Sequence, residues 1–212
     1  MPAPTDGRPG SDLRAAHPRL WRATRTPERL DVPPVGYLAV DGAGDPNTAP
    51  EYGAAVATLY AVAYTLRSAV KAAGGEPWTV MPLEGLWWAD DPGDFVRGER
   101  AAWRWTMLIA QPPVVTSEMV TDAVAAAAAR GKAPAAERLR HEVLEEGDAV
   151  QVLHHGPYAD EGPTVAALHA WIADAGLALR GAHHEVYLTD PRRSTPERMR
   201  TILRQPVAPA RA

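Results

Sequence analysis

The 212-residue sequence contains no cysteine, and this absence excludes several kinds of chemistry. A chain without thiols forms no disulfides, has no cysteine nucleophile, and cannot hold zinc or an iron–sulfur cluster through cysteine ligands. An excess of basic charge is missing as well, because 22 basic and 26 acidic side chains leave a formal net charge of −4. Such a balance disfavours binding to a phosphate backbone, so we expect no nucleic-acid partner.

Long hydrophobic runs are also missing. The longest one, residues 54–64, is interrupted by Thr58 and followed by Arg67, and it is too short to span a bilayer. The first residues, MPAPTDGRPGSDLR, lack the apolar centre of a signal peptide. We therefore expect no membrane partner and a cytoplasmic location.

Phenylalanine is scarce, since a single Phe stands against seven Trp. A buried indole needs a hydrogen-bond partner for its N–H group, which makes Trp a demanding choice for a core. The excess of Trp hints at a surface that binds flat apolar ligands, although a Trp-rich core is the commoner explanation.

The spacing of apolar residues predicts helices separated by strands. Helices are expected from Pro50 to the Gly74-Gly75 pair, over residues 117–130, and from Pro163 to Gly176. Alternating apolar residues predict strands, including one hairpin, over residues 35–41, 79–89, 100–111, 139–153 and 182–189. The two ends differ in composition from this body. Residues 1–30 are predicted to be a flexible or loosely docked arm, residues 31–207 one domain, and residues 208–212 a tail.

The two halves of this domain repeat one pattern. Residues 35–42 match 149–156, and each segment is a strand that ends in Gly and is followed by a loop, a Pro and a helix. The two later strands of each half also correspond, 83–92 to 184–191 and 106–112 to 201–206. The repeat indicates a strand at Met199–Arg204, although Thr195-Pro196-Glu197 is a good helix start. We therefore predict an α+β fold of two pseudo-symmetric strand–helix–strand–strand modules, about 31–113 and 136–207, with antiparallel sheets around a central ligand cleft.

Alternation along the strands predicts which side chains face the cleft. Val186 and Leu188 suit a helix-covered face, which leaves His183, Glu185 and Tyr187 on the opposite, free face. The repeat assigns further side chains to this free face from the other strands: Tyr37, Asp41, Glu84, Trp88 and His155. Trp103 and Trp105 share one face of a neighbouring strand and are expected to add an aromatic wall.

Two carboxylates in an indole-lined hollow would have useful chemistry. Burial and mutual repulsion raise the pKa of at least one of them. One of Glu84 and Glu185 could then act as an acid while the other activates water, and Tyr187 could donate a hydrogen bond to a developing oxyanion. The alternative is structural, with either glutamate pairing with an arginine or a backbone N–H group at a strand end.

Metal and cofactor motifs are weaker. One member of each histidine pair, His154-His155 and His183-His184, could bind zinc together with Glu185, but ordinary hydrogen-bonded histidines are the commoner case. Gly42-Ala43-Gly44 lacks the spacing of a dinucleotide-binding loop, and no P-loop sequence occurs. We therefore predict no metal and no cofactor.

Several motifs together resemble those of the GyrI-like small-molecule-binding family. They are LEGLWW at 83–88, HGPY at 155–158, HEVYLTDP at 184–191 and TILRQPV at 201–207. The resemblance covers about residues 19–207 and implies two pseudo-symmetric modules around an aromatic-lined pocket with a key glutamate, Glu185. In that family the domain often forms the effector-binding half of transcription regulators. The LEGLWW segment is similar to the branch of cyclopropanoid cyclopropyl hydrolases, which protect cells by hydrolysing cyclopropane-bearing DNA-alkylating natural products.

The resemblance and the derived site lead to one function and two rivals. We expect a hydrolase of flat, hydrophobic, multi-ring electrophiles, with Glu185 activating water, Tyr187 donating a hydrogen bond and Glu84 as a second acid or orienting group. Aromatic side chains would hold the ligand, among them Trp87, Trp88, Trp103, Trp105 and Tyr158. The first rival is a non-catalytic protein that sequesters or senses amphipathic drugs, some of them cationic. The second, inhibition of a topoisomerase, is suggested by the family name alone.

Overall fold

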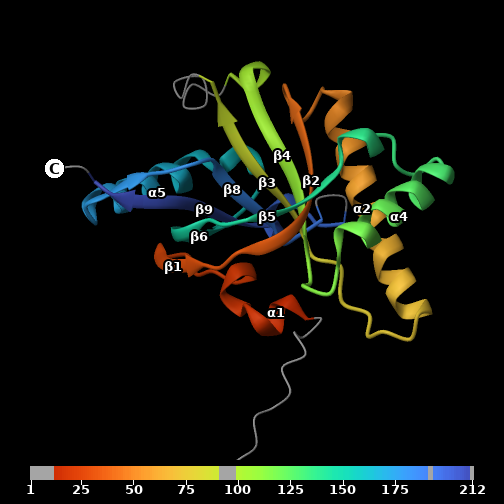
Figure 1. The fold of residues 1–212 in the computed structure, drawn as a ribbon. Coiled ribbons are helices and arrows are strands. Elements are labelled where there is room, and N and C mark those ends of the chain that lie inside the picture. Colours follow the sequence, from red (N-terminus) through yellow and green to blue (C-terminus); the bar gives the residue numbers. More distant parts are fainter. Residues whose placement is uncertain (1–11, 91–98, 191–192, 211–212) are drawn as a thin grey trace, which may run out of the picture.

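A single antiparallel sheet forms the centre of the protein in the computed structural model, which describes residues 12–90, 99–190 and 193–210 (Figure 1). Its nine strands among these residues are β1 Glu28–Val32, β2 Val35–Ala43, β3 Leu83–Ala89, β4 Trp103–Gln111, β5 Arg140–Leu144, β6 Gly147–His155, β7 Leu177–Leu179, β8 His183–Tyr187 and β9 Arg200–Pro209. They lie in the order β1-β6-β9-β8-β3-β4-β2-β5, with β7 added on β9.

Helices pack against this sheet. They are α1 Leu13–Ala16, α2 Pro50–Ala72, α4 Ser117–Ala129 and α5 Gly162–Asp174, with the 3-10 turns η1 Pro18–Trp21, η2 Arg100–Ala102, η3 Ala136–Arg138, η4 Tyr158–Asp160 and η5 Pro196–Arg198. The start signals act as expected: a proline opens α2, and the Thr116 hydroxyl accepts from the Met119 N–H at the start of α4. No helix in the described ranges is both long and apolar enough to cross a membrane.

The strand order reflects the predicted repeat. The first half contributes β2-β4-β3 from the outside inwards, and the second half contributes β6-β9-β8 in the same sense. β3 and β8 pair along Glu84–Trp87, so the halves form one continuous sheet rather than separate sheets on either side of a cleft. The predicted strand at 199–204 is confirmed, and the local helix signal before it gives only the short turn η5.

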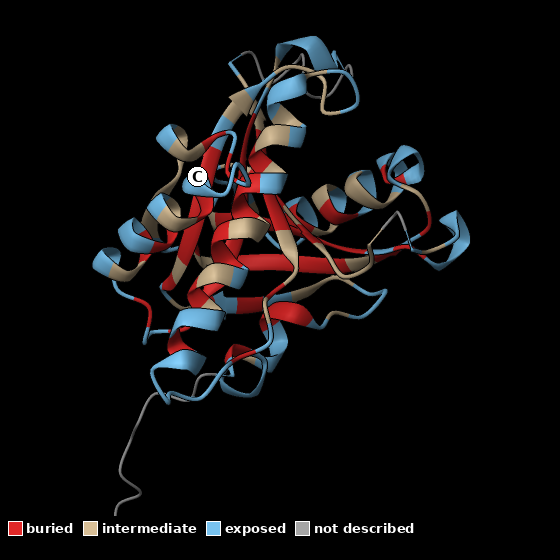
Figure 2. Cartoon of the chain, turned by 90° about the vertical axis from the view of Figure 1, so that its right-hand side faces the viewer, coloured by how far each residue is buried: buried red, intermediate tan, exposed pale blue. Residues whose placement is uncertain are grey.

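Helices α2 and α5 cover the same face of the sheet. Tyr52 of α2 packs on Trp87 of β3, and the α5 residues Leu168 and Ile172 pack on Leu203 of β9. Cross-strand pairing places Trp87 and Leu203 on one face of the sheet. α4 packs on α2 farther from the sheet, and buried residues gather on the sheet and on the helix sides toward it (Figure 2).

The segment before β2 covers the opposite face. Leu13, Leu20 and Trp21 are buried, and the backbone carbonyl of Leu20 accepts a hydrogen bond from Arg204 Nη2 at 2.6 Å. The expectation of a flexible or loosely docked arm is therefore wrong for residues 12–30, because its short elements carry anchors too widely spaced to show periodicity. Residues 1–11 of that arm, and residues 211–212 of the predicted tail, lie outside the described residues.

Candidate functional site

Glu185 lies in the middle of the sheet, where the two halves join. It stands opposite Gly85 on β3 and Leu203 on β9, and its side chain is 16% exposed. Its carboxylate is on the face covered by α2 and α5, whereas Val186 faces the N-terminal segment. The predicted assignment of faces is thus reversed for β8. An apolar Val186 indicated a covered face, but here both faces are covered.

Glu84, the second predicted catalytic carboxylate, points to the face opposite Glu185. It pairs with Val186, one position out of register with Glu185, so the two carboxylates lie on different sides of the sheet. Trp21 Nε1 donates to Glu84 Oε1 at 2.8 Å, and the Tyr37 hydroxyl donates to Oε2 at 3.2 Å. The side chain is 1% exposed. The prediction that Glu84 and Glu185 share one hollow is therefore wrong, and the Glu84 carboxylate is occupied by hydrogen bonds within the core.

A buried polar network continues from Glu84. His184 Nε2 lies 3.0 Å from Glu84 Oε2, its Nδ1 lies 2.9 Å from Glu146 Oε1, and Arg204 Nη1 lies 3.2 Å from Glu146 Oε2. Burial alone would lower the pKa of His184, but the Glu146 charge and the hydrogen bonds to both carboxylates raise it to about 9. Burial would raise the pKa of Glu146, yet His184 and Arg204 lower it to about 2. The network therefore holds fixed charges at neutral pH.

Aromatic side chains surround Glu185 on the helix-covered face. Trp87 packs edge-on against Trp103, with ring centroids 5.7 Å apart, and tilted against Tyr52 at 6.2 Å. Tyr158 packs edge-on against Tyr187 at 5.4 Å. Of the predicted aromatic wall, Trp87, Trp103 and Tyr158 are thus on the side of Glu185. Tyr52, in the first turns of α2, joins this wall although the sequence analysis did not include it among the site residues.

Trp105 belongs to the core beneath this wall. It is fully buried, and a Cβ at Gly42 would come within 2.0 Å of its Cη2 atom. The missing side chain at Gly42 therefore makes room for the indole, whose Nε1 donates to the Gly44 carbonyl at 3.3 Å. Trp105 contacts Tyr52 edge-on at 5.4 Å, so it supports the wall rather than forming its surface.

Other predicted ligand-binding residues do not converge on Glu185. Tyr37 and Trp88 lie on the face of Glu84, and Asp41, on that same face, accepts from the Thr106 hydroxyl at 2.7 Å. His155 is exposed at the end of β6. Strand alternation separates all four from the helix-covered face, which corrects their predicted place in the site.

Hydrogen bonds connect the indole of Trp87 to the carboxylate of Glu185. Trp87 Nε1 donates to the Tyr187 hydroxyl at 2.9 Å, and that hydroxyl is hydrogen-bonded to Glu185. Burial raises the pKa of Glu185 above its usual 4.5, and the hydrogen bond from Tyr187 limits this rise. Burial and the charge of Glu185 raise the pKa of Tyr187 well above 10, so its proton is retained. Tyr187 is committed to Glu185 rather than free to serve a ligand.

No positive charge from His183 balances Glu185. His183 Nε2 lies 3.7 Å from Glu185 Oε1, but burial lowers the pKa of this imidazole to about 3, with further lowering by His169 and His184. His183 is neutral at physiological pH. Its neighbour His184 faces the other side of the sheet, and within the described ranges no group of three or more His, Asp or Glu side chains is arranged to hold a metal ion.

Sequence reasoning missed a second carboxyl beside Glu185. Burial and the charge of Glu185 raise the pKa of Glu161 above the usual 4.5. Glu161 immediately precedes α5 and follows the HGPY segment by three residues. An acidic residue before a helix usually indicates a cap, so its sequence position carried no separate functional signal.

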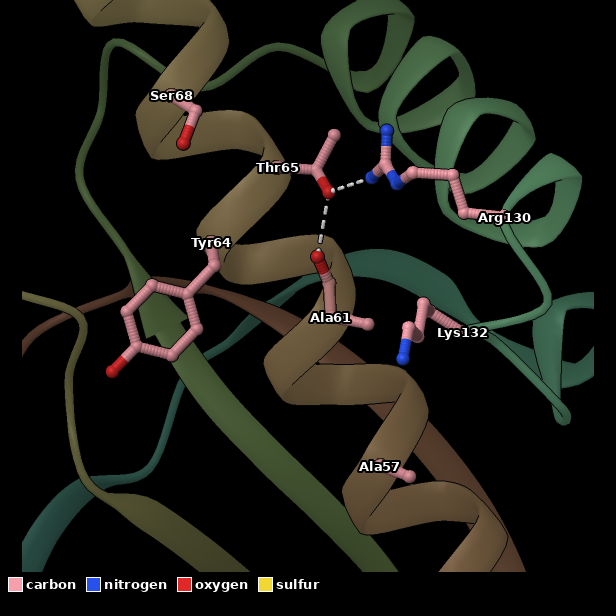
Figure 3. A pocket seen from close by; sticks show the side chains of 7 residues that line it. All are labelled: Ala57, Ala61, Tyr64, Thr65, Ser68, Arg130 and Lys132. Carbon is pink, nitrogen blue, oxygen red and sulfur yellow. Dashed lines mark hydrogen bonds between the residues drawn. The ribbon is translucent and has the colours of Figure 1, made fainter.

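A groove of about 500 Å³ lies elsewhere, between α2 and α4 (Figure 3). Its lining residues come from α2 and from the turn after α4: Ala57, Ala61, Tyr64, Thr65, Ser68, Arg130 and Lys132. Arg130 Nη2 donates to Thr65 Oγ1 at 2.7 Å. This lining contains no carboxyl or imidazole group, so we place the functional site at Glu185 instead.

Comparison with known proteins identifies the family. Residues 25–206 match the model of the GyrI-like small molecule binding domain. The chain belongs to the GyrI-like family. Its α+β fold agrees with what the sequence motifs implied. No curated protein matches this chain.

Solved structures of GyrI-like relatives include two from Listeria innocua at 38% sequence identity. One, described as an uncharacterized conserved protein, has a TM-score of 0.86, and the other, described as a hydrolase, has a TM-score of 0.81. Each alignment covers 94% of this chain and 100% of the relative. The C-terminal domain of EcmrR, at 14% identity and a TM-score of 0.55 over 87% of this chain and 98% of that domain, shares the fold.

Proposed function

We propose that this GyrI-like protein hydrolyses flat, hydrophobic electrophiles, with cyclopropane-bearing DNA-alkylating natural products as the substrate class. The observation that carries the proposal is the Glu185 carboxylate, mostly buried among aromatic rings yet 16% exposed. A relative at 38% identity is described as a hydrolase, which supports the reaction type. The activity would protect the cell, in its cytoplasm, against alkylation.

Glu185 would act as the general base. It accepts a proton from a water molecule, the water oxygen bonds to a cyclopropane carbon, and the strained C–C bond breaks. The electron pair of that bond moves into the conjugated ring, and the ligand's carbonyl oxygen takes up a proton to become a phenol. A raised pKa makes Glu185 a stronger base than an exposed carboxylate.

Tyr187 and Trp87 would keep the base in position. The indole N–H of Trp87 occupies the Tyr187 hydroxyl oxygen, so the phenolic proton is directed to Glu185. The rings of Tyr52, Trp103 and Tyr158 offer apolar surface for a flat ligand. Tyr158 is 36% exposed, which suits a residue at the entrance.

The test is hydrolysis of a synthetic spirocyclopropyl cyclohexadienone. Purified protein should convert it to a product heavier by one water, as followed by mass spectrometry. Glu185→Gln keeps the size of the side chain but removes the base, so turnover should fall at least ~10²-fold. Glu118→Gln, on the exposed side of α4, is the matched control and should keep the wild-type rate. Wild-type turnover in Glu185→Gln would refute the role of Glu185.

A second candidate, sequestration of cationic drugs, is favoured by the charge around Glu185. His183 beside Glu185 is neutral, and the other neighbour, Glu161, is itself a carboxyl, so neither neutralises the charge of Glu185. A charged carboxylate beside aromatic faces suits a lipophilic cation. Fluorescence titration should then show a cationic dye binding more tightly than its neutral analogue, with the preference lost in Glu185→Gln. Binding of the dienone without any product in the wild type would favour this candidate over hydrolysis.

A further inference from the structure

Glu161 is a buried carboxyl whose own helix does not use it. The residue is 7% exposed and occupies the N-cap position of α5, where an acidic side chain normally accepts hydrogen bonds from the first helical N–H groups. Its side chain makes no such bond, and its Oε1 atom has no hydrogen-bond partner among the described residues. A carboxyl oxygen buried without a partner costs free energy, so a structural cap does not explain this residue.

The surroundings of Glu161 place it at the Glu185 site. Tyr158, three residues earlier, packs on Tyr187, and Tyr187 pairs with Thr201 on β9. Thr201, on the same face of the sheet, lies close enough to the Glu161 carboxyl to lower its pKa through a hydrogen bond. The start of α5 therefore lies over the part of β8 and β9 that carries Glu185, and Glu161 Oε1 is available there to a ligand or water.

We propose that Glu161 is the proton donor of this site, giving its proton to the carbonyl oxygen of the ligand while Glu185 takes one from water. This inference rests on the proposed hydrolysis. One O–C bond forms, one C–C bond breaks, and the two carboxyls exchange their protonation states. A proton passing from Glu185 to Glu161 after product release restores the starting state, so no further reactant is needed.

The electrostatic surroundings are consistent with a protonated Glu161 beside an ionised Glu185. Burial disfavours a charged Glu161, and the charge of Glu185 disfavours it further. Five other titratable side chains surround the pair, and each is uncharged at neutral pH: Tyr52, Tyr158, His169, His183 and Tyr187. Two charged groups are also present, His184 on the other face of the sheet and Asp190 near Tyr158. Two carboxyls in such a place share one proton at neutral pH.

Titration of the ligand-free protein tests the pair without any turnover. Carbon NMR of side-chain-labelled glutamate should show Glu161 titrating well above pH 4.5, and its midpoint should fall in Glu185→Gln because the neighbouring charge is gone. Asp160→Asn, an exposed change one residue away, should leave that midpoint in place and serves as the control. A Glu161 that titrates near 4.5 in the wild type would overturn the inference.

Kinetics with the dienone test the proton transfer itself. The wild-type rate should rise with pH as Glu185 ionises and fall at higher pH as Glu161 ionises. Glu161→Gln should lower kcat about 10²-fold and abolish the fall at high pH, while its thermal unfolding remains that of a folded protein. An unchanged rate and unchanged high-pH limb in Glu161→Gln would refute this role alone. A wild type without turnover would instead refute the hydrolysis, even if the NMR titration showed the coupled pair.

Discussion

The buried imidazolium of His184 should make the stability of this protein depend on pH in a defined window. His184 is held between Glu84 and Glu146, and its pKa rises from 6.5 to about 9 on folding. Because the folded pKa is the higher one, the stabilisation is complete below pH 6.5 and is lost as the pH rises through about 9. A change of this size corresponds to about 3 kcal/mol of unfolding free energy.

The acidic side of the window comes from Glu146. Its pKa falls from 4.5 to about 2 on folding, so its stabilisation is complete above pH 4.5 and is lost as the pH falls through about 2. Both shifts describe the same imidazolium–carboxylate contact, so their free energies are not added. The network should stabilise the fold most between pH 4.5 and 6.5.

The substitution His184→Gln isolates this effect. Urea denaturation should show the variant about 3 kcal/mol less stable than the wild type near pH 6, with the gap closing to under about 1 kcal/mol by pH 10. His155→Gln, exposed at the end of strand β6, should show no gap at any pH. A gap in His184→Gln that did not vary with pH would show that the imidazole is uncharged in the fold.

Two further predictions concern the two faces of the sheet. Trp21→Phe keeps most of the buried apolar surface but removes the indole hydrogen bond to the buried Glu84 carboxylate. Urea denaturation should therefore show a loss of about 1.5–3 kcal/mol in the free energy of unfolding, and a loss below about 0.5 kcal/mol would mean that the N-terminal segment is not anchored there. Tyr187→Phe removes the hydrogen bond that stabilises ionised Glu185, so the low-pH limb of the dienone rate profile should move to higher pH, and a limb at the wild-type position would exclude this contact.

The face of the sheet that carries the polar network supports the site on the opposite face. β8 places His184 and Glu185 next to each other in sequence but on opposite faces. The charge of His184 lowers the pKa of Glu185, against the effect of burial. The polar network and the N-terminal segment therefore fix the strand that carries the base and also help to keep that base ionised.

The sequence by itself determined the order of helices and strands along the chain and the family. The repeat predicted a strand at 199–204 against a local helix signal, because a single proline-initiated turn cannot outweigh the pairing of a whole strand in the sheet. The HEVYLTDP and HGPY motifs directed attention to Glu185, Tyr187 and Tyr158, which do lie together. Apolar periodicity, motif spacing and the repeat can all be read along the chain, and these predictions needed no contact in space.

Only the tertiary structure decided which carboxylates meet. Side chains alternate along a strand, and β3 pairs with β8 so that Gly85, not Glu84, stands opposite Glu185. Glu84 therefore lies on the opposite face from the one that the repeat predicted. The alternation of apolar and polar residues also does not reveal what covers each face of the sheet. Here the N-terminal segment covers the face of Glu84, and the helices cover the face of Trp87. Glu161 comes to Glu185 because α5 packs across the sheet, a contact between segments that no local pattern records.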